Sequence, residues 1–419
     1  MSTLYEKVVR EQAEERKLFR SGAFIKRDAE HFFATKSKLI QIIMGIRRSG
    51  KSTLGHLAIN NKDYAYLNFD DERLIAITDK ELDKLLEALY SVYGDFTYLF
   101  LDEIQNIDNW SLFINRLYRQ GIQITITGSN SKLLSKELAT HLTGRYRSLE
   151  LLPFSFKEYT NYKKFKYTNT TKSNGLLLKH LNDYMQHGGF PEVLQGNATE
   201  QYVRDLVNAI INRDIIDRYV IKYTTALRQI AYFLIDNFSR ELSYNRIKNQ
   251  LKLKSEHTVK NYVNYLEEAY LIFTVSKFSY KKMEQLKYRK LYVPDPSFAT
   301  VLTNAPAIDR GFLLENIVFL ELYRRKAASN SDIFYYKQNE EVDFVITRNA
   351  KVWELIQVCY DLNSEKTFNR EVKALLNVSK ALKSKKLTII TYNDERTLQV
   401  DGKTIQIIPV GKWLLNLNA

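Results

Sequence analysis

The sequence predicts an α/β fold in which a helix-covered parallel sheet precedes a helical region and a second α/β module. From about residue 38 to 152, apolar runs of strand length alternate with helical patterns, which is typical of a parallel sheet that binds ligands at the carboxyl ends of its strands. A complete G-x-x-x-x-G-K-[ST] phosphate loop follows the first run and begins at Gly45. A third run ends in the adjacent carboxylates Asp102 and Glu103.

The elements of this first region follow in a regular order. Residues 4–20 carry charged and apolar positions at helical spacing and predict an N-terminal helix. The expected strands are Leu39–Met44, Tyr64–Phe69, Tyr98–Leu101, Gln123–Thr127 and Leu149–Leu152. The expected helices between them include Asp79–Tyr90 and Trp110–Gln120.

The phosphate loop meets each need of a bound triphosphate. Gly45 and Gly50 let the backbone curl so that N–H groups point at phosphate oxygens. Lys51 can reach the β- and γ-phosphates, the Ser52 hydroxyl can ligate Mg²⁺, and the helix that begins here adds its positive dipole end. The expected ATP-binding residues are Gly45, Arg48, Ser49, Gly50, Lys51, Ser52 and Thr53.

The acidic pair predicts the metal-binding and catalytic half of the same site. Asp102 would hold Mg²⁺ through water, and Glu103 would polarise the water that attacks the γ-phosphate. Two later features leave alternatives open. Ser129 and Asn130, at the tip of the fourth strand, form either a γ-phosphate sensor or a simple polar turn. Arg145 and a second arginine two residues later are either an arginine finger or surface charges.

Composition bounds the class of protein. A chain of 419 residues with 45% hydrophobic residues can form two or three domains, each with its own core. The formal charge of +14 favours a polyanionic partner such as nucleic acid, and a generally lysine-rich composition is the alternative explanation. The single cysteine, Cys359, excludes an internal disulfide and fits a reducing cytoplasm. No apolar run approaches the roughly eighteen residues of a membrane span, so we expect a soluble cytoplasmic protein.

The middle of the chain predicts two helical units. Residues 158–235 are dominated by helical patterns and fit a lid over the nucleotide. Residues 242–276 have the order helix, turn, helix, strand of a winged helix, whose second helix, Glu256–Glu268, is available to a major groove. The basic segment Lys277–Lys290 resembles a wing, and a unit used only for packing or protein contacts is the alternative. The expected DNA contacts are Lys254, His257 and Lys260.

The last hundred or so residues predict a separate α/β module. An amphipathic helix, Gly311–Arg325, comes first. It is followed by strands at Ile333–Lys337, Glu341–Thr347 and Lys351–Tyr360, a charged helix at Lys366–Leu382, and strands at Leu387–Thr391 and Thr404–Pro409. Because no Pro-rich linker separates the modules, we expect short connections between them.

Together these motifs resemble a prokaryotic family of AAA+ ATPases that carry a C-terminal restriction-endonuclease-like module. The matching segments are Gly45-Ile-Arg-Arg-Ser-Gly-Lys-Ser, Leu101-Asp-Glu-Ile-Gln, Thr127-Gly-Ser-Asn-Ser, Leu142-Thr-Gly-Arg, Leu152-Pro-Phe-Ser-Phe-Lys-Glu-Tyr, Gly188-Gly-Phe-Pro-Glu and Glu341-Val-Asp-Phe. The resemblance extends from about residue 26 to the C-terminus. It implies that Arg145 is the arginine finger and that Pro191, with Gly189 and Phe190, lies against the adenine.

The resemblance also implies a nuclease site of the PD-(D/E)xK type, from which this sequence departs. Such a site needs an Asp and then a Glu-x-Lys on the next strand to hold Mg²⁺ and activate water. Asp343 and an auxiliary acid, Glu315, fit this pattern, but Gln357 replaces the Glu and Cys359 replaces the Lys. Using Glu354 instead would turn the side chain to the other face of the strand. We therefore expect an inactive nuclease fold that could still bind DNA.

The expected architecture is a P-loop AAA+ parallel sheet with a helical lid, a winged-helix-like middle domain and a C-terminal α/β nuclease-like domain. The expected boundaries are 1–25 for the N-terminal helix, 26–157 for the ATPase core, 158–235 for the lid, 236–300 for the winged-helix-like domain and 305–419 for the nuclease-like domain. The leading hypothesis is a homo-oligomeric ATPase, with a hexamer as one option, that uses ATP and Mg²⁺ to remodel or translocate duplex or branched DNA. The alternatives are a nucleotide-gated signalling or scaffold ATPase that acts on a protein partner, and an active nuclease.

Overall fold

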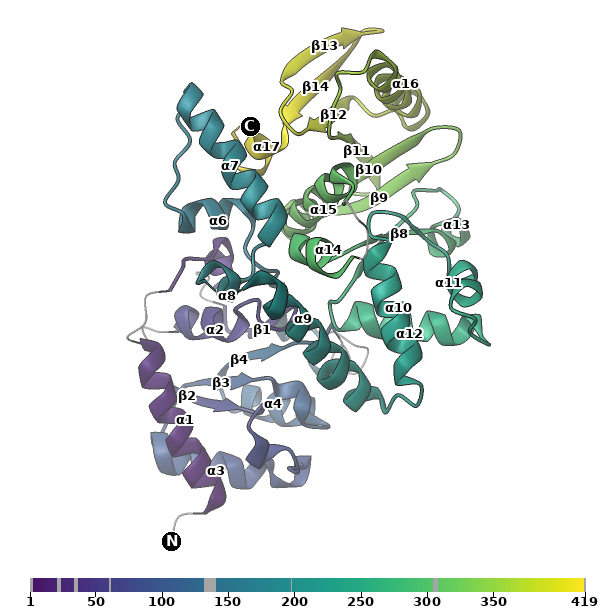
Figure 1. Cartoon of the computed structure of the whole chain (residues 1–419). Coiled ribbons are helices and arrows are strands. Elements are labelled where there is room, and N and C mark those ends of the chain that lie inside the picture. The colour runs from purple at the N-terminus through teal and green to yellow at the C-terminus, as the bar shows by residue number, and fades with distance from the viewer. Residues whose placement is uncertain are drawn as a thin grey trace. The chain divides into compact units, whose positions relative to one another are not determined.

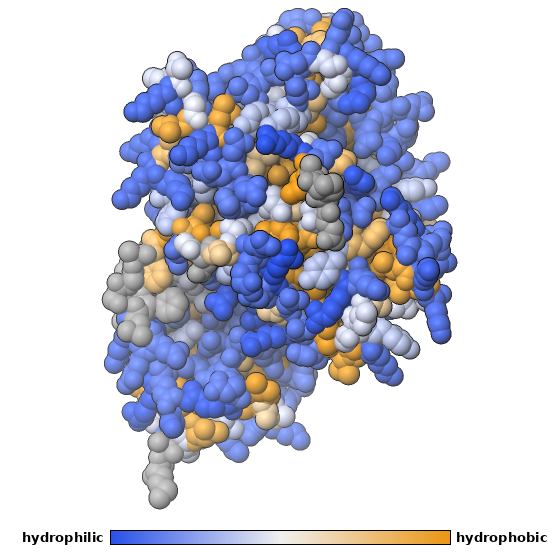
Figure 2. All heavy atoms as spheres, in the orientation of Figure 1, coloured by the Kyte–Doolittle hydropathy of each residue, from blue (hydrophilic) through white to orange (hydrophobic). Residues whose placement is uncertain are grey.

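The computed structural model describes residues 3–20, 24–33, 37–59, 62–131, 141–196, 198–303 and 308–417. The chain forms two compact units, Met1–Pro153 with Glu268–Tyr270, and Phe154–Glu267 with Leu271–Ala419. Across the ranges just given, no helix has the length and apolar character needed to cross a bilayer. Figure 2 shows a visible face on which hydrophilic residues predominate.

The first unit contains a five-stranded sheet in the order β2-β3-β4-β1-β5 (Figure 1). Its strands are β1 (Ile40–Met44), β2 (Tyr64–Asn68), β3 (Tyr98–Asp102), β4 (Gln123–Gly128) and β5 (Tyr146–Glu150). Every neighbouring pair is parallel, which confirms the predicted parallel sheet. Because β4 lies between β1 and β3, the ends of the three strands that carry the candidate ATP-site residues are adjacent.

Helices cover this sheet, and its central strands are buried along almost their whole length. All residues of β3 and β4 except the first are buried, as expected for parallel strands packed on both faces. α1 (Leu4–Arg20) and α3 (Leu82–Tyr93) pack on each other and on β2. α2 (Lys51–Ile59) packs on β1 and β4, and α4 (Trp110–Arg119) packs on β4.

The second unit begins with the expected helical region. It comprises α6 (Phe156–Tyr162), α7 (Thr171–His187), α8 (Pro191–Leu194), α9 (Thr199–Ala209), a π-helical segment (Ile210–Asp217) and α10 (Thr224–Asp236). α6 starts with a capping box, in which the Ser155 hydroxyl accepts from the Glu158 N–H and the Glu158 carboxylate accepts from the Ser155 N–H.

A small antiparallel sheet follows, in the order β6-β8-β7. Its elements are β6 (Glu241–Leu242), α11 (Tyr244–Gln250), α12 (Glu256–Glu268), β7 (Phe273–Ser276), α13 (Lys282–Lys287) and β8 (Arg289–Tyr292). The predicted order of helix, helix and strand is therefore present. Lys290, the last residue of the basic segment Lys277–Lys290, lies in β8 with its side chain buried.

The last module is a mixed six-stranded sheet in the order β13-β14-β12-β11-β10-β9 (Figure 1). Its strands are β9 (Ser331–Lys337), β10 (Glu341–Arg348), β11 (Lys351–Cys359), β12 (Lys386–Thr391), β13 (Arg396–Val400) and β14 (Lys403–Pro409). The helices are α14 (Pro296–Leu302), α15 (Arg310–Ser329), α16 (Glu365–Leu382) and α17 (Val410–Leu414). α15 and α16 both contact β11. β13 and α17 were not predicted from the sequence.

Candidate functional site

The phosphate-loop sequence connects β1 to α2 in a tight backbone turn. Gly45 has φ of +145° and Gly50 has φ of +91°. A Cβ atom on Gly45 would lie 2.1 Å from the carbonyl oxygen of Leu151, so this position requires glycine. α2 begins at Lys51, which places backbone N–H groups and the positive end of the helix at the turn, as an anion site needs.

The predicted ATP-site side chains come together at this turn. Lys51 is buried, and its Nζ lies 3.2 Å from the Ile46 carbonyl oxygen and 3.7 Å from Glu103 Oε1. Ser52 hydrogen-bonds Asp102, which brings the two expected Mg²⁺ ligands together. A hydroxyl and a carboxylate are ligand types that Mg²⁺ accepts, so these residues fit the metal that the sequence predicts. Arg48, Ser49, Gly50 and Thr53 lie on the same loop and first helical turn.

Asp102 and Glu103 differ in their electrostatic surroundings. Burial and the neighbouring Glu103 raise the pKa of Asp102 to about 6, although Thr127, Ser52 and Lys51 act in the opposite direction. Burial also acts to raise the pKa of Glu103, but Lys51 and a nearby arginine outweigh it and hold that pKa below its usual value. Glu103 therefore keeps the ionised form that a water-activating base needs.

Two polar side chains that the sequence analysis did not single out hold this acidic pair. The Thr127 hydroxyl on β4 donates to Asp102 Oδ1 and accepts from the Glu103 backbone N–H at 3.1 Å. Gln105 Nε2 donates to Glu103 Oε2 at 2.5 Å and to Ser129 Oγ at 3.4 Å. Gln105 thus connects the candidate base to the candidate sensor residue. The signal for this residue in the sequence was an amide side chain two positions after Glu103.

Arg27 is a third residue that the sequence analysis did not assign. It is buried, and its guanidinium donates to the Ser49 carbonyl oxygen and to the Leu152 carbonyl oxygen, each at 2.8 Å. It therefore ties the phosphate loop to the segment after β5. It stands more than twenty residues before the loop, so no local spacing connects the two in the sequence.

The remaining candidate ATP-site residues lie on different elements of the structure. Ser129 and Asn130 are buried at the end of β4. The Arg145 guanidinium donates to Asn115 on α4. Pro191 is the first residue of α8 in the second unit. The adenine and arginine-finger roles of Pro191 and Arg145 stay predictions.

The predicted DNA-binding side chains lie on the exposed face of α12 and on the turn before it. Lys254, His257 and Lys260 are exposed. The opposite face is buried, with Val259 fully covered and Tyr262 6% exposed. This division of the helix agrees with its predicted amphipathic pattern.

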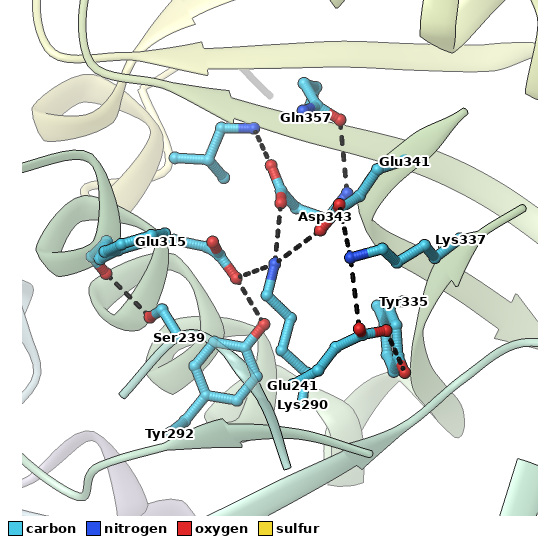
Figure 3. Close-up of polar contacts among 12 residues, drawn as sticks. Ser239, Glu241, Lys290, Tyr292, Glu315, Tyr335, Lys337, Glu341, Asp343 and Gln357 are labelled. Carbon is cyan, nitrogen blue, oxygen red and sulfur yellow. Dashed lines mark hydrogen bonds and ion pairs between the residues drawn. The ribbon is translucent and has the colours of Figure 1, made fainter. Parts of the chain in front are cut away.

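The candidate nuclease residues line a cavity of about 530 Å³ in the second unit. Figure 3 shows how the side chains of Glu315, Asp343 and Gln357 lie relative to one another. Asp343 Oδ2 accepts from the Val358 N–H at 2.9 Å, and the Gln357 amide oxygen accepts from the Asp343 N–H at 3.3 Å. Glu354 instead bonds the Thr388 hydroxyl at 2.7 Å, away from these residues.

Two further groups distinguish this cavity from a standard nuclease site. Cys359 also lines it, and burial together with the carboxylate of Glu371 raises the pKa of its thiol to about 11, so it stays neutral. The Nζ atom of Lys290 lies 2.9 Å from Glu315 and 3.1 Å from Asp343. The sequence analysis included this lysine in the wing-like basic segment Lys277–Lys290 and did not connect it with the acids.

Comparisons with known proteins match most of the chain. Residues 37–160 match the model of an AAA domain, and residues 178–309 and 310–413 match two domains of unknown function, DUF8612 and DUF4143. An uncharacterized protein of Methanocaldococcus jannaschii is 40% identical over 431 residues, which cover 98% of this chain and 95% of that protein. An uncharacterized protein of Haemophilus influenzae is 30% identical over 395 residues, which cover 90% of this chain and 94% of that protein. A Walker-type ATPase of Pyrococcus abyssi is similar in structure, with 15% identity, 67% of this chain and 96% of that chain covered, and a TM-score of 0.40.

Proposed function

We propose that this chain, which belongs to a family of P-loop ATPases, hydrolyses ATP and couples hydrolysis to the remodelling or translocation of DNA. The observation that carries the ATPase assignment is the meeting of Lys51, Ser52, Asp102 and Glu103 at one edge of a parallel sheet. These are the cation, the two metal ligands and the base that phosphoryl transfer to water requires.

Each side chain has a distinct task in this proposal. Lys51 binds the β- and γ-phosphates, and Ser52 and Asp102 hold Mg²⁺, which neutralises charge on the phosphates. Glu103 accepts the proton of the attacking water. Gln105 positions Glu103 through the hydrogen bond described above.

The DNA-binding part of the proposal is supported by charge on the unit built from α11, α12 and the β6-β8-β7 sheet. Its order of helices and strands is compatible with a winged helix, in which α12 would enter the major groove. The segment between β7 and β8 exposes several lysines together with Tyr280 and Met283, which are 82% and 79% exposed. Lysines bind phosphates, and exposed apolar tips can insert between bases.

A charge-matched pair of variants tests this interface. Lys254→Glu with Lys260→Glu should weaken binding to duplex DNA by about tenfold or more. The slope of log affinity against log salt concentration should fall by the equivalent of about two phosphate contacts. Lys366→Glu with Lys373→Glu, on exposed positions of α16, changes the net charge equally and should have a much smaller effect. Basal ATP hydrolysis should be the same in both variants.

The coupling of the two activities is measured by ATP turnover with and without DNA. The proposal predicts faster hydrolysis with duplex or branched DNA. It also predicts that this stimulation is lost in the variant that carries Lys254→Glu and Lys260→Glu. DNA binding that is insensitive to salt, or hydrolysis that is indifferent to every DNA form, would instead favour a nucleotide-gated switch that acts on a protein partner.

A further inference from the structure

Lys290 on β8 is a buried cation at the centre of a group of carboxylates from other elements (Figure 3). Its side chain is 5% exposed. Its Nζ atom lies 2.9 Å from Glu315 Oε1 on α15, 3.1 Å from Asp343 Oδ1 and 3.5 Å from Glu341 Oε1, the latter two on β10. The ammonium group therefore joins the small sheet to the C-terminal module through three acidic contacts.

The same carboxylates are fixed by other donors, so their orientation toward the lysine is not accidental. The Tyr292 hydroxyl donates to Glu315 at 2.6 Å. The Val358 N–H donates to Asp343 Oδ2, which leaves Asp343 Oδ1 for Lys290. Asp343 thus presents its remaining oxygen to the ammonium group, and Glu315 presents Oε1, the same oxygen that the Tyr292 hydroxyl holds.

A divalent cation bound by Glu315 and Asp343 would have to take nearly the same position. Mg²⁺ and Mn²⁺ lie about 2–2.2 Å from carboxylate oxygens, whereas an ammonium nitrogen lies near 3 Å. A metal ion and an ammonium group at this point would repel each other strongly in a buried setting. Within the described part of the chain, no set of three or more Asp, Glu, His or Cys side chains is arranged to hold a metal ion.

We propose that Lys290 is the internal cation of this pocket and that it keeps divalent metal ions out of the Glu315–Asp343 site. Lys290 then offsets negative charge in this pocket without a metal ion. Replacement of Lys290 by a neutral side chain turns the same acids into a divalent-cation site, with Gln357 as a neutral ligand beside them. Burial acts to lower the pKa of Lys290, but Glu315 and Asp343 outweigh it and raise that pKa, so the lysine stays charged.

The test is a Mn²⁺ titration of the nucleotide-free protein, read by the electron paramagnetic resonance signal of free Mn²⁺. Lys290→Met should gain one site that binds at least tenfold more tightly than any site in the unsubstituted protein. Adding Asp343→Asn to this variant should remove the gain. Lys337→Met is the matched control, because Lys337 also pairs with Glu341 but is 43% exposed, and it should gain no site.

The stability of the variant gives a second measurement. Lys290→Met leaves carboxylates buried without their cation, which should lower its melting temperature, and Mn²⁺ should raise that temperature again in this variant only. Lys290→Arg keeps the positive charge and should gain no metal site. The proposal is overturned if Mn²⁺ binds stoichiometrically to the unsubstituted protein at a site that Asp343→Asn removes. It is also overturned if folded Lys290→Met binds Mn²⁺ no better than the control. The measurement on the unsubstituted protein decides the question even if Lys290→Met does not fold.

Discussion

Replacement of Gln105 by alanine should slow ATP turnover and leave ATP binding almost unchanged. The Gln105 amide donates to the Glu103 carboxylate at 2.5 Å and reaches Ser129 at 3.4 Å. On its other side Glu103 faces Lys51 at 3.7 Å. The amide therefore fixes the position of the candidate base between the phosphate loop and the end of β4. A base that is free to rotate spends less time in hydrogen-bond reach of the attacking water.

The size of the effect follows from the hydrogen bond that is lost. A hydrogen bond to a charged group contributes about 1.5–3 kcal/mol. If the whole contribution is lost in the transition state, the rate falls about 13- to 160-fold, since each 1.36 kcal/mol is a factor of ten. Glu103 itself remains, so we expect kcat to fall about tenfold to hundredfold, which is less than removal of the carboxylate would cause.

Steady-state kinetics of phosphate release distinguish a positioning role from a general loss of structure. Asn106→Ala is the matched control, because Asn106 lies on the same turn but its amide donates to the Phe69 carbonyl oxygen. The control should keep its kcat, and both variants should keep the KM for ATP to within about a factor of two. An unchanged or raised kcat in Gln105→Ala would refute the positioning role, as would an equal loss in the control.

Other expectations concern the base, the loop and the assembly. Glu103→Gln should retain ATP binding, measured by equilibrium dialysis, and lose turnover, because the base is removed while the metal ligands remain. Gly45→Ala should destabilise the first unit by roughly 2–6 kcal/mol in thermal or denaturant unfolding, since its Cβ would overlap the Leu151 carbonyl, whereas Gly175→Ala in open space should not. Arg145→Ala should reduce turnover about a thousandfold if it acts as an arginine finger. Mixing Arg145→Ala with Glu103→Gln protein should then restore activity if the finger acts between subunits, and co-assembled subunits that stay inactive would exclude this.

The parallel sheet and its ligand edge were predictable because their signals are local. Buried parallel strands leave apolar runs in the sequence, and the phosphate loop requires glycine at Gly45 and Gly50 for reasons of backbone geometry alone. The position of Asp102 and Glu103 follows from the rule that parallel strands present their carboxyl ends at one edge. The winged-helix and nuclease-like identities stay predictions, although the described order of helices and strands is compatible with the first.

The residues that were missed act across long separations in sequence. Arg27 bonds the Leu152 carbonyl oxygen, 125 positions away, and Lys290 bonds Asp343, 53 positions away. A lysine in a basic segment is expected to be exposed, and only the pairing of β8 with β6 and β7 turns Lys290 toward the acids. Such contacts depend on tertiary structure, which periodicity and spacing in one segment do not report.

The lysine–carboxylate groups around Lys51 and Lys290 differ in a way that bears on their roles. In the first unit Lys51 meets one carboxylate at 3.7 Å, and it also donates to a backbone carbonyl oxygen. A triphosphate offers several negative oxygens, so it can draw this lysine away from Glu103 and leave the base free for water. In the second unit Lys290 meets two buried carboxylates at about 3 Å, and no anion could compete without leaving them uncompensated. The first arrangement suits a group that changes partners in each catalytic cycle, and the second suits a permanent one. We therefore expect Lys51 to respond to nucleotide and Lys290 to respond only to substitution, which nitrogen-15 NMR of the two ammonium groups with and without ATP would separate.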